Sequence, residues 1–500
     1  MDYLLFFELF STSKEGGFMK NKKMTYDVDE CPPLKEWIIL ALQHVFAMFG
    51  ATILVPILVN SAAGETVLTI PVALVTSGIG TLIYVLCTKG KSPVYLGSSF
   101  AFIAPIAAAF AKGGISGAMT GIMAVGLIYV IVAMIIKFAG KAWLDKLLPP
   151  VVIGPMIMII GLGLAPSAIS QVGIASGTAF EWKVVLVALF SFIVTAIVMT
   201  RAKGFFKIIP FLVGIISGYI LAVILGMIDF KPVLEASFFS MPDFVIPFVD
   251  YTISFGALMT IAPIALVTLC EHIGDHKSLS NIIDKDLIND PGLDRTMMGD
   301  GIATFVAGLL GGPANTTYGE NTSVVGMTKV ASVKVIILAA IFAIVIGILG
   351  KFTALVSTIP SSVLGGVSLL LYGFIAVNGL KVLISNQVNF EIPKNVIVAS
   401  SMLVIGLGGA AISLVNGDMS ITLSGMSLAS IVGIILNLTL KDEEEEECEF
   451  EVHECKCSNN VQDELDRIKN DIKEELTIEI KSELLDEIRK ELNKDKKTKK

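Results

Sequence analysis

The chain has 500 residues, of which 54% are hydrophobic and only 16% are charged. This composition excludes an ordinary soluble globular protein, because most of the chain is too apolar to face water. The net charge of -8 identifies no partner, since acidic residues gather after residue 440.

Fourteen membrane segments are predicted from the apolar runs. Runs of about 17 to 25 residues are long enough to cross roughly 30 Å of hydrocarbon as helices. The predicted segments are 36–59, 68–87, 92–110, 115–136, 147–164, 184–200, 205–227, 252–272, 296–310, 314–329, 332–350, 353–380, 394–413 and 419–440. They leave a cytoplasmic N-terminal segment (1–35) and an acidic cytoplasmic tail (441–500) on either side of a transmembrane domain (36–440).

The loops between these segments differ in charge. With the N-terminus inside, the inner loops hold fifteen Lys and Arg residues, whereas the outer loops hold only Lys112, Lys183, Lys231 and Lys351. Short cytoplasmic loops normally carry this excess, and one missed segment would invert every later loop. We therefore expect a multi-pass protein of the cytoplasmic membrane with both termini inside.

Two of the predicted segments are interrupted. Residues 92–105, SPVYLGSSFAFIAP, and residues 314–329, ANTTYGENTSVVGMTK, are rich in glycine and hydroxyl side chains. They belong to the third and the tenth segment, which are seven apart. Paired interruptions at matching places in two halves are typical of inverted-repeat transporters with a central site. The sequence therefore predicts an all-α polytopic membrane protein built as a seven-plus-seven inverted repeat.

The eighth segment ends in a cluster of titratable residues: Glu271, His272, Asp275 and His276. Helical spacing places Glu271 and Asp275 on one face, where two like charges repel. The repulsion makes one of them easier to protonate than in water, which is what proton coupling requires. The alternative is that the cluster is only the solvent-exposed end of this helix.

The tenth segment carries an acid, Glu320, near its centre. A carboxylate at membrane depth is costly to bury, so a chain that keeps one there usually uses it on a substrate or an ion. The preceding Gly311, Gly312 and Pro313 break any approaching helix. Polar side chains at 315–317 can pair with the backbone groups that the break frees. This pattern predicts a broken, substrate-binding segment.

Three other polar residues in apolar runs give weaker signals. His44 either faces a substrate or bonds to a helix neighbour. Tyr372 and Asn378 either line a site or anchor their helix at the membrane interface.

These motifs resemble the nucleobase/ascorbate transporter family, also called nucleobase:cation symporter-2, and within it the bacterial uracil permeases. The tenth segment matches the family signature at Glu320, Asn321, Thr328 and Lys329, with Ser323 where the family has Gly. QHVFAMFGATILVP, YLGSSFAFIAP and NTTYGEN match further stretches in the right order between residues 36 and 440.

The resemblance implies a core domain of segments one to four and eight to eleven, which moves against a gate domain of segments five to seven and twelve to fourteen. It implies a short strand in each of segments three and ten, the two strands crossing near mid-membrane. It also implies a homodimer.

The resemblance further implies roles for particular residues. Glu271 and Glu320 match two substrate-binding carboxylates, and Phe100 and Gly319 match positions whose backbone meets the base. Tyr318 and Ala51 match pocket-lining positions. Asp275 stands where close relatives have a histidine implicated in proton coupling, so Asp275, Glu271 and His272 are the candidates for that role.

The predicted function is proton-coupled import of uracil, with no enzymatic activity and no cofactor. Uracil presents two N–H donors and two carbonyl acceptors without charge, which suits carboxylates together with backbone N–H groups. Phe100 is suited to cover a ring face. The alternatives are a xanthine, uric acid or other purine permease, an anion exchanger or channel of the same architecture, and a receptor that signals through its tail.

The tail, 441–500, has an apolar stripe at nearly helical spacing, which indicates either a self-associating amphipathic helix or a solvated, partly disordered segment. Its Cys448, His453, Cys455 and Cys457 fit no established zinc pattern, so no metal site is predicted. Its acidity argues against nucleic-acid binding.

Overall fold

The computed structural model describes residues 24–203, 206, 209–253, 261–416 and 419–440. The predicted tail, with its Cys and His residues, lies outside the described residues, as does most of the predicted N-terminal segment.

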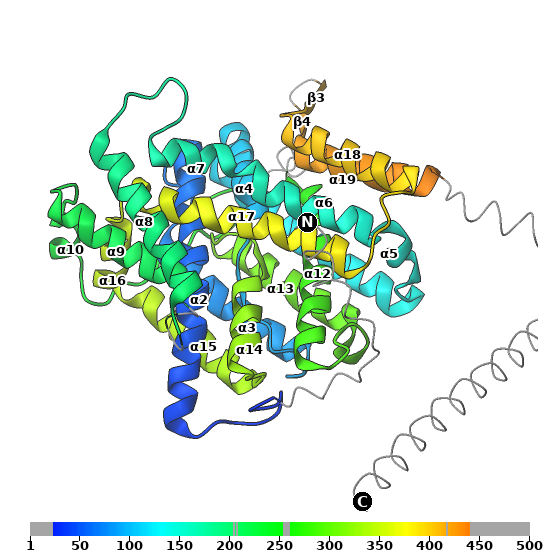
Figure 1. Cartoon of the computed structure of the whole chain (residues 1–500), viewed down its shortest axis with the longest axis horizontal. Helices are drawn as coiled ribbons and strands as arrows, with labels where there is room; N and C mark the ends of the chain where they lie inside the picture. Colours follow the sequence, from blue (N-terminus) through cyan, green and yellow to red (C-terminus); the bar gives the residue numbers. More distant parts are fainter. Residues whose placement is uncertain (1–23, 204–205, 207–208, 254–260, 417–418, 441–500) are drawn as a thin grey trace, which may run out of the picture. The chain divides into compact units, whose positions relative to one another are not determined.

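The described residues form helices and two short antiparallel sheets (Figure 1). In chain order the elements are α2 (Leu34–Ala63), α3 (Ile70–Cys87), β1 (Leu96–Ser98), the 3-10 turn η1 (Phe100–Phe102), α4 (Ile103–Ala139), α5 (Ala142–Leu147), α6 (Pro150–Gly163), α7 (Ala165–Val172), α8 (Trp182–Arg201), α9 (Pro210–Ile224), α10 (Lys231–Glu235), α12 (Ile264–Ile283), the π-helical turn η3 (Ile288–Gly292), α13 (Leu293–Leu309), β2 (Asn315–Thr317), α14 (Gly319–Thr328), α15 (Val333–Ile348), α16 (Gly350–Ser357), α17 (Ser361–Ser385), α18 (Pro393–Leu407), β3 (Ala411–Asn416), β4 (Met419–Ser424) and α19 (Gly425–Thr439).

Each of the fourteen predicted segments contains at least part of one of these helices. The third and fourth segments share α4, which is broken at Gly114, where the backbone leaves the helical region with φ 59°. Among the described residues, six helices are long and apolar enough to cross a membrane, and α15 with α16, bent by 80°, would make a seventh. Three shorter apolar helices, α9, α18 and α19, add to these. The full count of fourteen spans stays a prediction.

Two predicted segments differ from the helices that the structure forms. The helix of the eighth segment does not end at residue 272, because α12 continues to Ile283 with His272 and His276 fully buried against other helices. Polar residues there pack inside the protein, so their polarity does not mark the end of the helix. The twelfth segment is two helices, because the chain breaks before Pro360, a residue that cannot continue a helix from α16 into α17.

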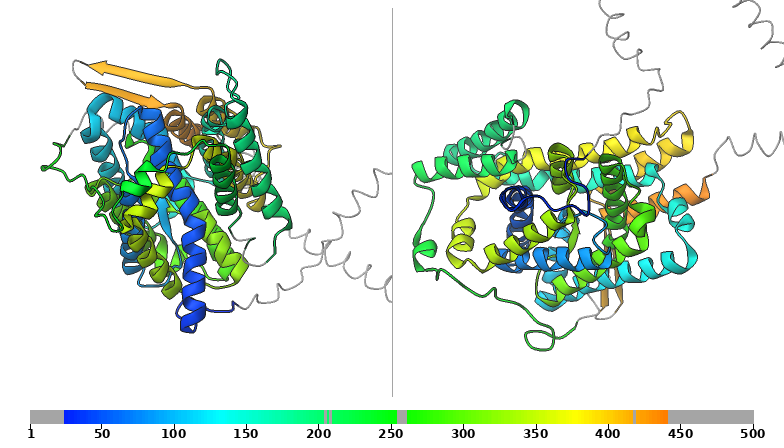
Figure 2. Two further views of the ribbon diagram at one scale, coloured as in Figure 1. Left: turned by 90° about the vertical axis from the view of Figure 1, so that its left-hand side faces the viewer. Right: turned by 90° about the horizontal axis from the view of Figure 1, so that it is seen from below.

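The thirteenth and fourteenth segments are shorter than predicted. Their adjoining ends form a hairpin of β3 and β4, paired from Ala411 with Ser424 to Asn416 with Met419 (Figure 2). The sequence signal was present: apolar and polar residues alternate from Met419 to Ser424, and the dipeptide Gly417-Asp418 before them favours a two-residue turn. We predicted membrane segments there instead, because the adjoining stretches are strongly apolar.

The helices pack in two groups. In one, α13 packs on α3 and α4, and α15 packs on α2 and α3. In the other, α17 packs on α6, α7 and α8, while α18 and α19 pack on each other and on α6. Small residues permit the closest approaches. A Cβ on Gly126 of α4 would come within 2.4 Å of the backbone nitrogen of Phe305 in α13.

The N-terminal residues tie two helix ends together. The backbone of Tyr26 forms a parallel bridge with Val330, directly after α14. Asp27 forms a 2.6 Å ion pair with Lys285, just after α12, and the hydrogen bond from this lysine lowers the pKa of Asp27. Residues 24–30 therefore link the ends of α12 and α14, the two helices that carry Glu271 and Glu320.

The predicted strands of the third and tenth segments are present and pair with each other. β1 and β2 run antiparallel, with Leu96 opposite Thr317 and Ser98 opposite Asn315. Side-chain hydrogen bonds join both strands to α3. Ser77 Oγ donates to Leu96 O at 2.6 Å, and Asn315 Nδ2 donates to Thr76 O at 3.3 Å. This pairing lets non-helical backbone exist at membrane depth.

We expect Gly97→Ala to destabilise this crossing by about 1–3 kcal/mol, the usual effect of overpacking. A Cβ on Gly97 would lie 2.4 Å from the ring of Tyr318. Gly163→Ala is the matched control, because a Cβ there meets nothing within 4 Å. Thermal unfolding in detergent measures both variants. Equal melting midpoints for the two would show that the crossing is loosely packed.

Candidate substrate-binding site

A cavity of about 1720 Å³ lies where β2 and the start of α14 face α12 and α17. One side, which we call the acidic wall, consists of α12, β2 and α14 and carries Glu271, Asp275 and Glu320. The remaining helices of the lining, which we call the apolar wall, are α6, α9 and α17. Its apolar residues include Ile153, Ile157, Phe211, Leu371, Phe374 and Ile375.

The structure brings the three predicted carboxylates to one cavity. Glu271 and Asp275 lie one turn apart on α12, as the helical spacing predicted, and Glu320 is the second residue of α14. Two threonines of β2 contact the acids of α12. Thr316 Oγ1 donates to Glu271 Oε2 at 3.4 Å, and Thr317 Oγ1 donates to Asp275 Oδ2 at 2.6 Å. The strand therefore fixes the orientation of both acids, a role that the sequence did not suggest.

Gly319 leaves the cavity open beside these acids. A Cβ placed on it would lie 4.0 Å from Asp275 Oδ1 and 3.9 Å from Asn378 Nδ2. As the first residue of α14, Gly319 has a backbone N–H without a partner in its own helix, and helix N-termini favour polar acceptors.

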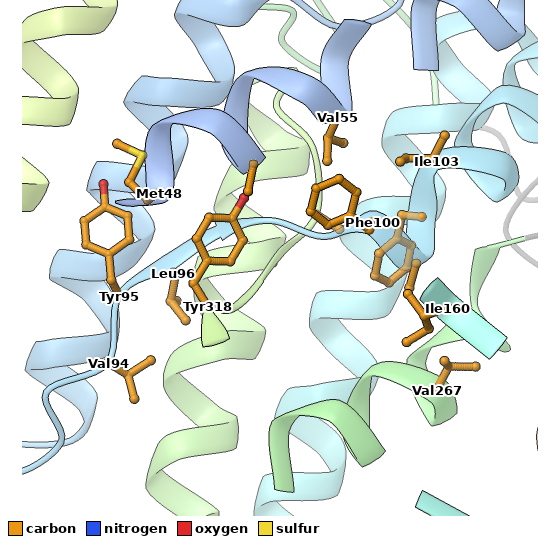
Figure 3. Close-up of a cluster of buried hydrophobic side chains, with 14 of the residues drawn as sticks. Met48, Val55, Val94, Tyr95, Leu96, Phe100, Ile103, Ile160, Val267 and Tyr318 are labelled. Atoms are coloured by element: carbon orange, nitrogen blue, oxygen red, sulfur yellow. The ribbon is translucent and has the colours of Figure 1, made fainter. Parts of the chain in front are cut away.

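The predicted pocket residues Tyr318 and Ala51 are less central than expected. Tyr318 borders the cavity but is buried in a cluster of hydrophobic side chains (Figure 3). Its hydroxyl donates to Ser98 O at 2.9 Å and accepts a hydrogen bond from Thr52 Oγ1 at 3.1 Å. It braces the crossing of the two strands. Ala51 lines a narrow crevice next to the cavity, which also includes Glu320.

Phe100 supplies an aromatic surface to the cavity. It opens the turn η1 directly after β1, and its ring meets Tyr372 of α17 edge to face, with centroids 5.9 Å apart. Tyr372 is buried, so it is not an interfacial anchor. Asn378, two turns further along α17, lines the cavity.

His272 lies away from the cavity, in a buried polar cluster. Its Nδ1 is 2.9 Å from Asp300 Oδ2, and its Nε2 is 3.1 Å from Thr296 Oγ1. Because Thr296 donates its own proton to Leu293 O, its oxygen accepts from His272 Nε2–H. The contact between Nδ1 and Asp300 then requires one further proton, which the two side chains share.

Asp300 is the residue that the sequence reasoning missed. It lies in α13 within the apolar ninth segment and is 1% exposed, and its Oδ1 has no partner among the described residues. The rule that singled out Glu320, an acid inside an apolar run, applies equally to Asp300.

His276 and His44 also form hydrogen bonds in the protein interior. His276 Nδ1 donates to His272 O at 2.7 Å, and its Nε2 lies 2.6 Å from the Tyr84 hydroxyl. His44 contacts Asn321 Nδ2 at 3.1 Å and is 1% exposed, so it bonds to a neighbouring segment. No group of three His, Cys, Asp or Glu side chains in the described part of the chain has metal-binding geometry.

Comparison with known proteins identifies the family. The model of the Permease family, Xan_ur_permease, matches residues 35–415. The chain belongs to this permease family. The resemblance to nucleobase transporters inferred from the tenth-segment signature is thereby confirmed.

The permease has relatives of nearly its own length. It is 47% identical over 437 residues to the uracil permease of Bacillus subtilis, covering 86% of this chain and 98% of that protein. It is 42% identical over 418 residues to the uracil permease of Escherichia coli, covering 83% of this chain and 93% of that protein.

Solved structures of more distant proteins share the fold. The transmembrane domain of the cyanobacterial bicarbonate transporter BicA superposes with a TM-score of 0.54 at 16% identity, covering 81% of this chain and 97% of that one. The murine anion transporter Slc26a9 in its inward-facing state superposes with a TM-score of 0.60 at 11% identity, covering 87% of this chain and 74% of that one. The predicted seven-plus-seven inverted-repeat fold is therefore confirmed.

Proposed function

We propose that this permease imports uracil across the cytoplasmic membrane by proton symport. The observation that carries the proposal is the acidic wall, where Glu271, Asp275 and Glu320 face one cavity beside the open N-terminus of α14. The relatives named uracil permease, at 47% and 42% identity, support uracil as the substrate.

The chemistry of the acidic wall suits a neutral ring with both donors and acceptors. Carboxylates of Glu271 and Glu320 accept the two N–H groups of uracil, and the backbone N–H of Gly319 donates to a ring carbonyl. Phe100 covers one ring face. An anionic substrate would meet three carboxylates unfavourably, which argues against anion exchange despite the shared fold.

A proton enters with the substrate because the three acids repel one another where they face one cavity. Protonating one of them relieves the repulsion and supplies a neutral partner for the ring. We assign the proton to Asp275, which lies beside Glu271 on the acidic wall, with Glu271 as its electrostatic partner. We assign His272 and Asp300 a structural role, because they share a proton away from the cavity.

Alternating access follows from the two helix groups. We assign α2–α4 and α12–α15 to the core domain and α6–α9 and α17–α19 to the gate domain. The cavity between them extends from the acidic wall to Lys277, Lys285, Lys329 and Lys381, which the charge asymmetry of the loops places in the cytoplasm. The cavity is then open to the inside, and movement of the core against the gate would expose it outward. The resemblance also supports a homodimer, which crosslinking in native membranes tests.

Uptake of labelled uracil in cells that lack their own permease tests this function. We expect saturable uptake that an inward proton gradient increases and that excess unlabelled uracil suppresses. Competition by xanthine or uric acid as strong as by uracil would favour a purine permease instead. If deleting residues 441–500 leaves uptake unchanged, transport does not need the tail, which argues against a receptor that signals through it.

A further inference from the structure

The two walls of the cavity differ in polarity, and on the apolar wall the cavity-lining residues of α17 change from apolar to polar at Asn378. The residues of α17 that line the cavity before it are Leu371, Phe374 and Ile375, all apolar. Lys381, Ser385 and Asn386 follow nearer the end of the helix. In the described residues, Asn378 is thus the polar side chain of this wall that reaches closest to Gly319.

The amide of Asn378 lies close to both Gly319 and Asp275. Asn378 Nδ2 and Asp275 Oδ1 both lie within about 4 Å of a single point beside Gly319, at 3.9 Å and 4.0 Å. The side chain of Asn378 is exposed to the cavity and makes no hydrogen bond in the part of the chain that the structure describes. Its donors are therefore available to a ligand.

We propose that Asn378 is a specificity-determining residue that donates a hydrogen bond to one carbonyl of the transported ring from the apolar wall. The inference rests on the proposed function. The acidic wall offers acceptors, which match the two ring N–H groups, but the two ring carbonyls need donors. The backbone N–H of Gly319 serves one carbonyl. The NH2 group of Asn378 is the facing donor for the other, and the contact forms as the two walls approach.

Two variants of Asn378 remove the donor with little change in shape. Leucine has a similar size and no hydrogen-bonding group, and aspartate has the same shape but only acceptors. Ser361→Ala is the matched control, because Ser361 is exposed at the start of α17 and does not line the cavity. Binding to the purified full chain is measured by calorimetry with uracil, 2-thiouracil and 4-thiouracil. Sulfur accepts hydrogen bonds more weakly than oxygen, so each thio analogue probes one carbonyl.

We expect the wild-type protein to bind one thio analogue more weakly than uracil. In Asn378→Leu, the Kd for uracil should rise about tenfold, the effect of one lost hydrogen bond in a buried site. The preference for uracil over that same analogue should disappear. The ratio of the Kd of the other analogue to the Kd of uracil should stay as in the wild type. Asn378→Asp should lose the same preference, and Ser361→Ala should change neither quantity.

Two results would overturn the inference. One is a Kd for uracil within twofold of wild type in both Asn378 variants. The other is weaker binding with both thio ratios unchanged, which would indicate a merely structural role. If the wild-type protein binds none of the three bases, the proposed function and this inference fall together. If it binds uracil and the Asn378 variants behave as wild type, only the inference falls.

Discussion

Replacing either Glu271 or Glu320 by alanine is expected to raise the Kd for uracil by about 10- to 100-fold or more. Both carboxylates line the same cavity on the acidic wall. A hydrogen bond to a charged group contributes about 1.5–3 kcal/mol, so losing one partner leaves a buried ring N–H unpaired and weakens binding by one to two orders of magnitude. The remaining carboxylate also loses a neighbour that helps to position it, which weakens binding further.

Calorimetry or filter binding on purified variants measures the loss. Glu65→Ala is the control, because Glu65 is exposed between α2 and α3 and far in sequence from the acidic wall. Melting midpoints equal to wild type would show that the loss does not arise from unfolding. A Kd within threefold of wild type for either acid variant would remove that residue from the binding site.

Asp275→Asn is expected to spare binding and to remove the dependence of uptake on a proton gradient. Asparagine keeps the shape of the side chain, and its carbonyl oxygen can still accept the hydrogen bond from Thr317. It cannot take up and release a proton. In proteoliposomes with an acidic exterior, wild-type protein should accumulate uracil, whereas the variant should only equilibrate it.

Asp145→Asn, on the exposed surface of α5, controls for the purification and reconstitution. Accumulation by Asp275→Asn at the wild-type level would contradict the assignment of the proton to Asp275. Glu271 would then be the remaining carboxylate of α12 on the acidic wall that could carry it.

Much of the site could be predicted because its residues violate the rules of a lipid-facing helix. Glu271, Asp275 and Glu320 stand out as acids in apolar surroundings, and the interrupted third and tenth segments stand out by their glycine and hydroxyl content. In each case burial of a costly group signals a function. The structure places all three acids at one cavity and pairs β1 with β2.

Other features depend on which way a side chain points, which spacing alone does not give. His272 follows Glu271 directly, but it points away from the cavity toward Asp300. Tyr318 precedes Gly319, but its hydroxyl bonds to Thr52 and Ser98. Neighbouring residues on a helix or at its start face different surroundings, and only the packing of other elements decides between them.

Hydropathy was least informative where polar residues pack inside the protein or apolar strands extend beyond a helix. The buried His272 and His276 gave α12 a false end, and the apolar β3 and β4 looked like continuations of α18 and α19. Both errors arise because hydropathy reports the average polarity of a segment and not its partners.

A cryo-EM structure of the full chain with uracil bound tests the central claim most directly. The account predicts a single ring between Glu271 and Glu320, with a carboxylate oxygen of each about 3 Å from a ring nitrogen. A ring bound elsewhere in the protein, or contacted by only one of these two carboxylates, would contradict it.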